Sequence, residues 1–178
     1  MPFHTLIPAC LCSAQNFRYK SGTPRSIDLE IHANKDEKVI LFEIDEKTNL
    51  ISNFREYCGM CGKGQAICDL MIFYFSESDK TKTRKKHKII CLVESKGLDI
   101  DHALTQIENT FLNVKEKFSN KDCHYYPVKW SGYILTNRMG AMHTPDRERY
   151  ERRFRKIFQH NCRISDNGDI SDFLRSVK

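Results

Sequence analysis

Two apolar segments near the middle of the chain constrain its fold more than any other feature. They are QAICDLMIFYF (65–75) and HKIICLVES (87–95), and both remain apolar at successive positions. A strand without a polar face is typical of the centre of a sheet that is covered on both sides. The residues between them, SESDKTKTRKKHK, are almost all charged or polar, which indicates a solvated hairpin tip. The pattern therefore predicts an antiparallel hairpin at the centre of a sheet.

Further elements flank this hairpin on both sides. Residues 26–33 and 38–45 alternate apolar and polar side chains around the turn-like NKDE, which predicts a β-hairpin. KWSGYILTN (129–137) predicts another strand, and TPDRERYERRFRKIFQH (144–160) predicts a helix that starts near a proline. The C-terminal residues are mixed in composition. With 178 residues, the chain fits one domain of the α/β or α+β class, with a central mixed sheet flanked by helices.

A helix is predicted directly after the central hairpin. Asp99 or Asp101 is well placed to cap its N-terminus. One stripe of the helix is apolar at helical spacing, and a separate stripe is polar. The apolar stripe comprises Leu104, Ile107, Phe111, Val114 and Phe118, and the polar stripe comprises His102, Gln106, Asn109 and Asn113.

The second apolar strand ends in a carboxylate and a lysine that share one face. Glu94 and Lys96 are two positions apart, and side chains alternate across a strand. If the two apolar strands pair as a hairpin, Asp69 lies on the neighbouring strand close to Glu94. Two adjacent carboxylates repel each other unless one takes up a proton or a cation lies between them. Oxygen ligands of this kind favour Mg²⁺ or a similar hard cation.

These residues resemble the core of the PD-(D/E)xK nuclease superfamily, in the stretches CDLMIFY, LVESKG and HALTQIENT. The resemblance covers roughly residues 65–137 and implies a restriction-endonuclease-like core. It also implies that Asp69 and Glu94 bind Mg²⁺ or Mn²⁺ with the backbone carbonyl of Ser95, that Lys96 is the catalytic lysine, and that Gln106 is an accessory residue. Cys68 stands where the family pattern has proline. A third acidic ligand is not singled out, and the candidates are Glu43, Asp45 and Glu56.

The cysteines suggest a second, structural metal site. CGMCGKG (58–64) contains a Cys-x-x-Cys followed by glycine, which is typical of a zinc knuckle. Tetrahedral coordination needs two further ligands, and the candidate set is Cys10, Cys12, Cys58 and Cys61. A redox pair, free thiols and an iron–sulfur cluster remain open alternatives. Cys68 and Cys91 have strand parity opposite to Asp69 and Glu94, so we expect them to be small core residues.

Positive charge is concentrated in two regions of a chain with a formal charge of +6. The first is the hairpin tip and the second is the predicted helix 144–160. Both regions suit contacts with phosphates of a nucleic acid, although solvated faces would have the same composition. The candidate nucleic-acid-binding residues are Lys82, Arg84, Lys85, Lys86, Arg138, Arg149, Arg152 and Arg153.

Two functions are compatible with these features. The first is a metal-dependent nuclease that hydrolyses phosphodiester bonds, with DNA expected rather than RNA from the resemblance alone. The alternative is a non-catalytic nucleic-acid-binding or assembly module with a zinc knuckle. A domain this small makes one cut at a time, so double-strand cleavage would require a homodimer or two visits. We expect no membrane partner and a cytoplasmic location, because no long apolar run or signal-peptide pattern occurs.

Overall fold

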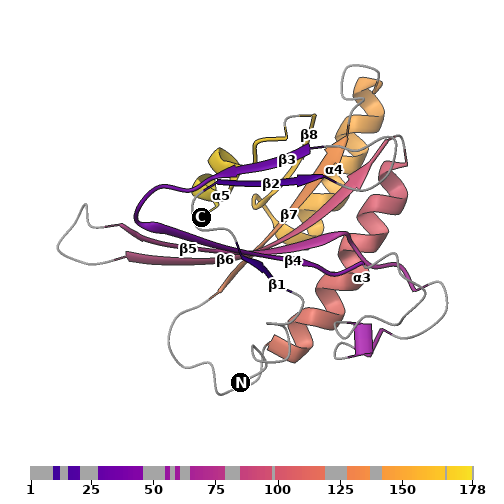
Figure 1. The fold of residues 1–178 in the computed structure, drawn as a ribbon. Coiled ribbons are helices and arrows are strands. Elements are labelled where there is room, and N and C mark those ends of the chain that lie inside the picture. Colours follow the sequence, from indigo (N-terminus) through magenta and orange to yellow (C-terminus); the bar gives the residue numbers. More distant parts are fainter. Residues whose placement is uncertain are drawn as a thin grey trace.

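The computed structural model describes residues 10–12, 16–20, 28–45, 55–56, 59–60, 65–78, 85–97, 99–118, 128–136, 142–166 and 168–177. These residues form a mixed α/β structure (Figure 1). A six-stranded sheet has the order β1-β4-β5-β6-β7-β8, and β2 and β3 form a separate two-stranded sheet. No helix in this part of the chain is long and apolar enough to cross a membrane.

The main sheet is antiparallel on one side and parallel on the other. Strands β1, β4, β5 and β6 pair antiparallel, whereas β6, β7 and β8 pair parallel. Its strands are β1 (Cys10–Cys12), β4 (Glu37–Glu43), β5 (Leu70–Ser78), β6 (Lys85–Lys96), β7 (Lys129–Thr136) and β8 (Cys162–Ser165). The mixed sheet predicted from the sequence is therefore confirmed.

The predicted central hairpin is β5 and β6, which pair from Leu70↔Val93 to Ser78↔Lys85. Both faces of β6 are buried, as its apolar sequence predicts. Ile90 and Leu92 belong to one hydrophobic cluster, while Cys91 and Val93 belong to the cluster on the opposite face. The hairpin therefore holds the two layers of the core together.

Helices α3 (Ile100–Phe118) and α4 (Thr144–Phe158) connect the parallel strands and cover one face of the sheet (Figure 1). Parallel strands require such crossover connections, and helices normally supply them. Leu104 and Ile107 of α3 and Phe154 of α4 are buried against this face. Both helices were predicted. Asp99 caps α3, because its Oδ1 accepts the His102 N–H at 3.0 Å.

The opposite face is covered by the small sheet and the C-terminal helix. Strand β2 (Asn16–Lys20) pairs antiparallel with β3 (Asp28–His32), and α5 (Ser171–Ser176) packs beside them. Leu29 and Ile31 of β3 and Phe173 of α5 lie in the same buried cluster as Tyr133. The mixed C-terminal residues thus contribute both β8 and α5, which their composition did not predict.

The predicted hairpin between residues 26–33 and 38–45 is wrong in its pairing. Both segments form strands, but β3 pairs with β2, and β4 pairs with β1 and β5. The alternating pattern of β3 is satisfied across the layers, since Leu29 and Ile31 turn toward the main sheet and its cluster. The alternating pattern predicts that one face of the strand is buried. It does not specify which strand is its hydrogen-bonded neighbour.

An ion pair between the exposed Arg175 and the buried carboxylate of Glu37 ties α5 to the start of β4. Arg175 Nε lies 2.9 Å from Glu37 Oε1, and its Nη2 lies 3.0 Å from Oε2. The same carboxylate accepts the Tyr74 hydroxyl at 2.7 Å and the Asn34 N–H at 2.8 Å. Burial raises the pKa of Glu37, but these hydrogen bonds and the Arg175 charge outweigh it and lower the pKa to about 2. This carboxylate is fully satisfied and stabilises the fold.

Candidate active site

The structure brings Asp69, Glu94 and Lys96 together at one end of the central hairpin. Two reciprocal hydrogen bonds join the strands at this point. The Asp69 N–H donates to Glu94 Oε2 at 2.9 Å, and the Ser95 N–H donates to Asp69 Oδ2 at 2.9 Å. Each carboxylate is therefore oriented by the backbone of the other strand. The adjacency predicted from the hairpin register follows directly from this pairing.

Glu94 is fully buried, and this determines its electrostatics. Burial and the nearby Asp69 charge raise the pKa of Glu94 to about 8, despite the opposing effect of Lys96. Lys96 Nζ lies 2.9 Å from Glu94 Oε1. Burial lowers the pKa of Lys96, but the charge and hydrogen bond of Glu94, together with the charges of Asp69 and Asp45, outweigh burial and the net shift is upward. A buried carboxylate with a raised pKa beside a second carboxylate is a site that favours an added cation.

Helix α3 holds the segment that leads into Asp69. Gln106 Nε2 donates to the Ile67 carbonyl at 2.7 Å, and Thr110 Oγ1 accepts the Cys68 N–H at 2.9 Å. Gln106 was predicted as an accessory residue, and its hydrogen bond positions the backbone next to the carboxylates. Within the described part of the chain, Gln106 Oε1 is buried and accepts no hydrogen bond. Thr110 carries no sequence signal that would have distinguished it from an ordinary helix residue.

Of the three candidate acids left open by the sequence, Asp45 contacts the site through its backbone. The Ile44 and Asp45 N–H groups both donate to the Asp69 carbonyl, at 2.9 and 3.4 Å. The charge of Asp45 also contributes to the raised pKa of Lys96. Arg55 Nη2, however, lies 2.6 Å from Asp45 Oδ1. The described residues contain no group of three or more His, Cys, Asp or Glu side chains that could hold a metal ion.

Thr136 is a further residue at this end of the sheet that sequence reasoning missed. It lies opposite Lys96 in the parallel register of β6 and β7. Its hydroxyl donates to the Gly97 carbonyl at 2.7 Å and is almost fully buried. This bond holds the backbone of Gly97, which directly follows Lys96. A threonine at a strand end is common, and only the register reveals its role.

The predicted zinc site lies largely outside the described residues, which do not include Cys58 and Cys61. Cys10 and Cys12 form the ends of β1, where their backbones pair with Phe42 and Ile40. Cys68 and Cys91 are buried free thiols, as expected. Burial raises the pKa of Cys91 to about 12. These two thiols are therefore core residues without the character of reactive groups.

The candidate nucleic-acid-binding residues divide into two groups. Lys82, Arg84 and Arg138 lie outside the described residues, and Lys85 and Lys86 are placed only as backbone at the start of β6.

The arginines of α4 have protein partners. Arg149 lies 3.0 Å from Asp101, and Arg153 lies 3.1 Å from Glu108, both on α3. Arg152 donates to the carbonyl of Glu148 within its own helix at 3.3 Å. The side chains at positions 149 and 153 thus connect α4 to α3, close to the turn that follows Lys96.

Comparisons with known proteins identify no relative. No family model matches the chain, and the searches of curated proteins and of solved structures found no match. The resemblance to the PD-(D/E)xK nucleases accordingly rests on the sequence motifs alone.

Proposed function

We propose that the protein is a metal-dependent nuclease that hydrolyses phosphodiester bonds, with DNA as the expected substrate. The observation that carries this proposal is the pairing of Asp69 with the buried Glu94, with Lys96 2.9 Å from the latter. A second observation supports it. The hairpin of β5 and β6 is followed by helix α3, which is the order of elements that the resemblance implies.

The residues present fit a hard divalent cation. Mg²⁺ commonly uses one or two protein carboxylates and takes its remaining ligands from water and phosphate. Asp69 and Glu94 would supply the carboxylates, and the Ser95 carbonyl would complete the protein ligands. The raised pKa of Glu94 supports this assignment, because burial beside Asp69 leaves its charge poorly compensated. When bound, Mg²⁺ or Mn²⁺ would lower the pKa of a water and neutralise charge on the phosphate oxygens.

The chain's own residues would prepare the reaction. Lys96 would orient the attacking water and stabilise the negative charge that develops on the phosphate. Gln106 and Thr110 would keep the segment 67–69 in place through their backbone hydrogen bonds. Thr136 would hold the turn after Lys96. Main-chain N–H groups of the opposite strand thus help to set the positions of both carboxylates.

A cleavage assay tests the proposal. Purified protein is incubated with plasmid DNA, single-stranded DNA and single-stranded RNA, in Mg²⁺ or Mn²⁺ and in EDTA. We expect Asp69→Ala and Lys96→Ala to reduce cleavage by about a hundredfold or more. Lys115→Ala is the matched control, because Lys115 is exposed on α3, nine residues beyond Gln106, and its Nζ lies 5.0 Å from the ring centre of Phe111. Cleavage that survives both site substitutions would refute the assignment.

The non-catalytic alternative has one observation in its favour. Lys96 already pairs with Glu94, and each carboxylate already accepts a backbone N–H. Such a cluster would also be satisfied as a purely structural element. Oligonucleotide binding without cleavage in any of the metals tested would support a binding module over a nuclease.

A further inference from the structure

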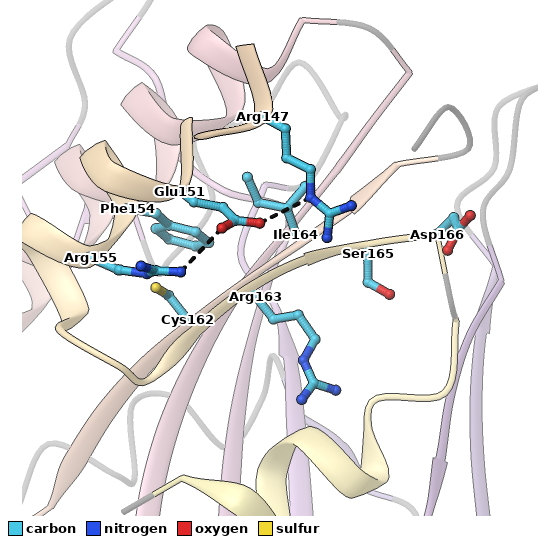
Figure 2. Close-up of a pocket in the computed structure, with 9 residues that line it drawn as sticks. All are labelled: Arg147, Glu151, Phe154, Arg155, Cys162, Arg163, Ile164, Ser165 and Asp166. Carbon is cyan, nitrogen blue, oxygen red and sulfur yellow. Dashed lines mark hydrogen bonds and ion pairs between the residues drawn. The ribbon is translucent and has the colours of Figure 1, made fainter. Parts of the chain in front are cut away.

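A polar groove lies between α4 and the edge strand β8, separate from the carboxylate site. Its volume is about 580 Å³. Figure 2 shows Arg147, Glu151 and Arg155 above β8, and Arg163 on the other side of this strand. Ser165 and Asp166 lie at its end near the carboxyl terminus of β8. The groove therefore presents the guanidinium groups of Arg147 and Arg155, and the guanidinium of Arg163 lies across the edge strand from them.

The arginines of α4 are divided between two directions by helical spacing. Arg149 and Arg153 contact α3, where Asp101, Thr105 and Glu108 hold them. Residues 147, 151 and 155 recur every four positions and share the side that faces β8. Arg149 and Arg153 therefore contact α3, whereas Arg147 and Arg155 lie in the groove.

The ion pairs that Arg147 and Arg155 make within the protein are exposed and therefore weak. Glu151 pairs with Arg147 at 3.0 Å and with Arg155 at 3.1 Å, and both are exposed pairs at i,i+4 spacing. Pairs of this kind contribute little to stability and exchange readily. Arg163 is exposed, and its guanidinium carbon lies 5.2 Å from the ring centre of Phe173. Among the described residues it makes no ion pair.

One end of the groove, at Ser165 and Asp166, lies at the same end of the sheet as the candidate active site. Ser95 pairs with Leu135, and Leu135 pairs with Ser165, so three parallel strands end side by side. Neighbouring strands are about 4.8 Å apart, which places Ser165 about 10 Å from Ser95. A nucleic-acid strand in duplex form carries one phosphate about every 3.4 Å of axis, so this separation corresponds to about three nucleotides.

We propose that this groove binds the phosphate backbone of the nucleic-acid strand that enters the candidate active site. The proposal rests on the proposed function for the identity of the strand. Guanidinium groups bind phosphates through two parallel hydrogen bonds, which are stronger than their exposed pairs with a single carboxylate. Glu151 would exchange its partners for phosphate, and Arg163 would contact the backbone from the other side of β8.

Removing the competing carboxylate provides the sharpest test. Glu151→Gln keeps the shape of the side chain and releases both α4 arginines. Asp36→Asn is the matched control, because it also removes one negative charge, but from an exposed turn directly before β4. Binding is measured by fluorescence anisotropy with a short labelled DNA duplex in EDTA, which prevents cleavage. We expect Glu151→Gln to tighten binding about fivefold, and Asp36→Asn to have a much smaller effect.

A second pair of variants tests the contacts directly. Arg155→Ala with Arg163→Ala should weaken binding and reduce the slope of log affinity against log salt by about 1.8, or about 0.9 per lost phosphate contact. Lys35→Ala with Lys38→Ala removes the same charge from exposed positions around the start of β4 and should reduce the slope less. Thermal unfolding followed by circular dichroism verifies that each variant is folded.

The outcomes separate this proposal from the nuclease assignment. If binding depends on the groove variants and no cleavage is found, the groove is supported and the nuclease function fails. If the protein cleaves DNA and the groove and control variants bind it equally well, the groove proposal is overturned while the nuclease function stands. A change in oligomeric state by light scattering, without a change in oligonucleotide binding, would also overturn it and indicate a contact between copies of the chain.

Discussion

Replacing Glu94 with glutamine is expected to stabilise the protein while it abolishes cleavage. The pKa of Glu94 is about 8 in the folded protein, against an ordinary value of 4.5. A carboxyl whose folded pKa is raised costs stability above its unfolded pKa, because ionisation is easier in the unfolded chain. The cost at about pH 7 is about 3 kcal/mol. Glutamine removes this cost and retains an oxygen for the Asp69 N–H.

The expected net gain is smaller than the full electrostatic cost. Lys96 loses its partner in this variant, but part of its side chain reaches solvent, so its charge can be hydrated. We therefore expect an increase of about 1–3 kcal/mol in the free energy of unfolding. The increase should shrink to about 1 kcal/mol or less near pH 5, where Glu94 is protonated in the folded state and about a quarter protonated in the unfolded chain.

Urea denaturation followed by fluorescence of the single tryptophan, Trp130, measures this change. Glu37→Gln is the matched control, since the same substitution there breaks a satisfied ion pair with Arg175 and should be destabilising. The two buried glutamates are thus expected to respond with opposite signs. If Glu94→Gln destabilises the protein as much as Glu37→Gln, then Glu94 and Lys96 form a structural ion pair and the energetic argument for a cation site is refuted.

Three further perturbations follow from the packing. The pKa of Glu37 is lowered to about 2, so its ionised form contributes about 3 kcal/mol to the free energy of unfolding above about pH 4.5. This contribution should be lost as the pH falls toward 2, which urea denaturation at acid pH measures. Gly132→Ala should destabilise the protein by about 1–3 kcal/mol, because a Cβ there would lie 2.6 Å from the Phe154 ring. Gly97→Ala is the control, because a Cβ there meets no atom within 4 Å, and it should lower the thermal unfolding temperature much less. Arg153→Ala should lower stability by about 1–2 kcal/mol through loss of its contacts with α3, while Arg152→Ala should change it by about 0.5 kcal/mol or less in the same measurement.

The central hairpin and the adjacency of its acidic residues could be predicted because both depend on local rules. Strand parity places Glu94 and Lys96 on one face, and antiparallel pairing of consecutive strands brings Asp69 beside Glu94. The helix stripe with Leu104 and Ile107 follows from the same kind of periodicity. These features need only neighbouring segments of sequence and the shortest connections between them.

Features that depend on distant segments could not be predicted. Strand β3 pairs with β2, and its N–H at Glu30 donates to the carbonyl of Gly168, far away in the sequence. No pattern in residues 26–33 distinguishes this arrangement from a hairpin with β4. Strand β8 is only four residues long, and its pairing with β7 becomes apparent only after the crossover through α4 is formed. Short edge elements of this kind derive their stability from the sheet that they join.

The arginines of α4 show why composition alone could not select the residues of the proposed nucleic-acid-binding groove. Each carries the same charge, and all lie on one amphipathic helix. Packing against α3 places Asp101 and Glu108 beside Arg149 and Arg153, so these two stabilise the fold. Packing against β8 leaves Arg147 and Arg155 in a groove with Arg163 from another element. Whether an arginine of α4 could bind a phosphate backbone therefore depends on which carboxylates the fold places beside it. These tertiary contacts cannot be read from the number of basic residues in the sequence.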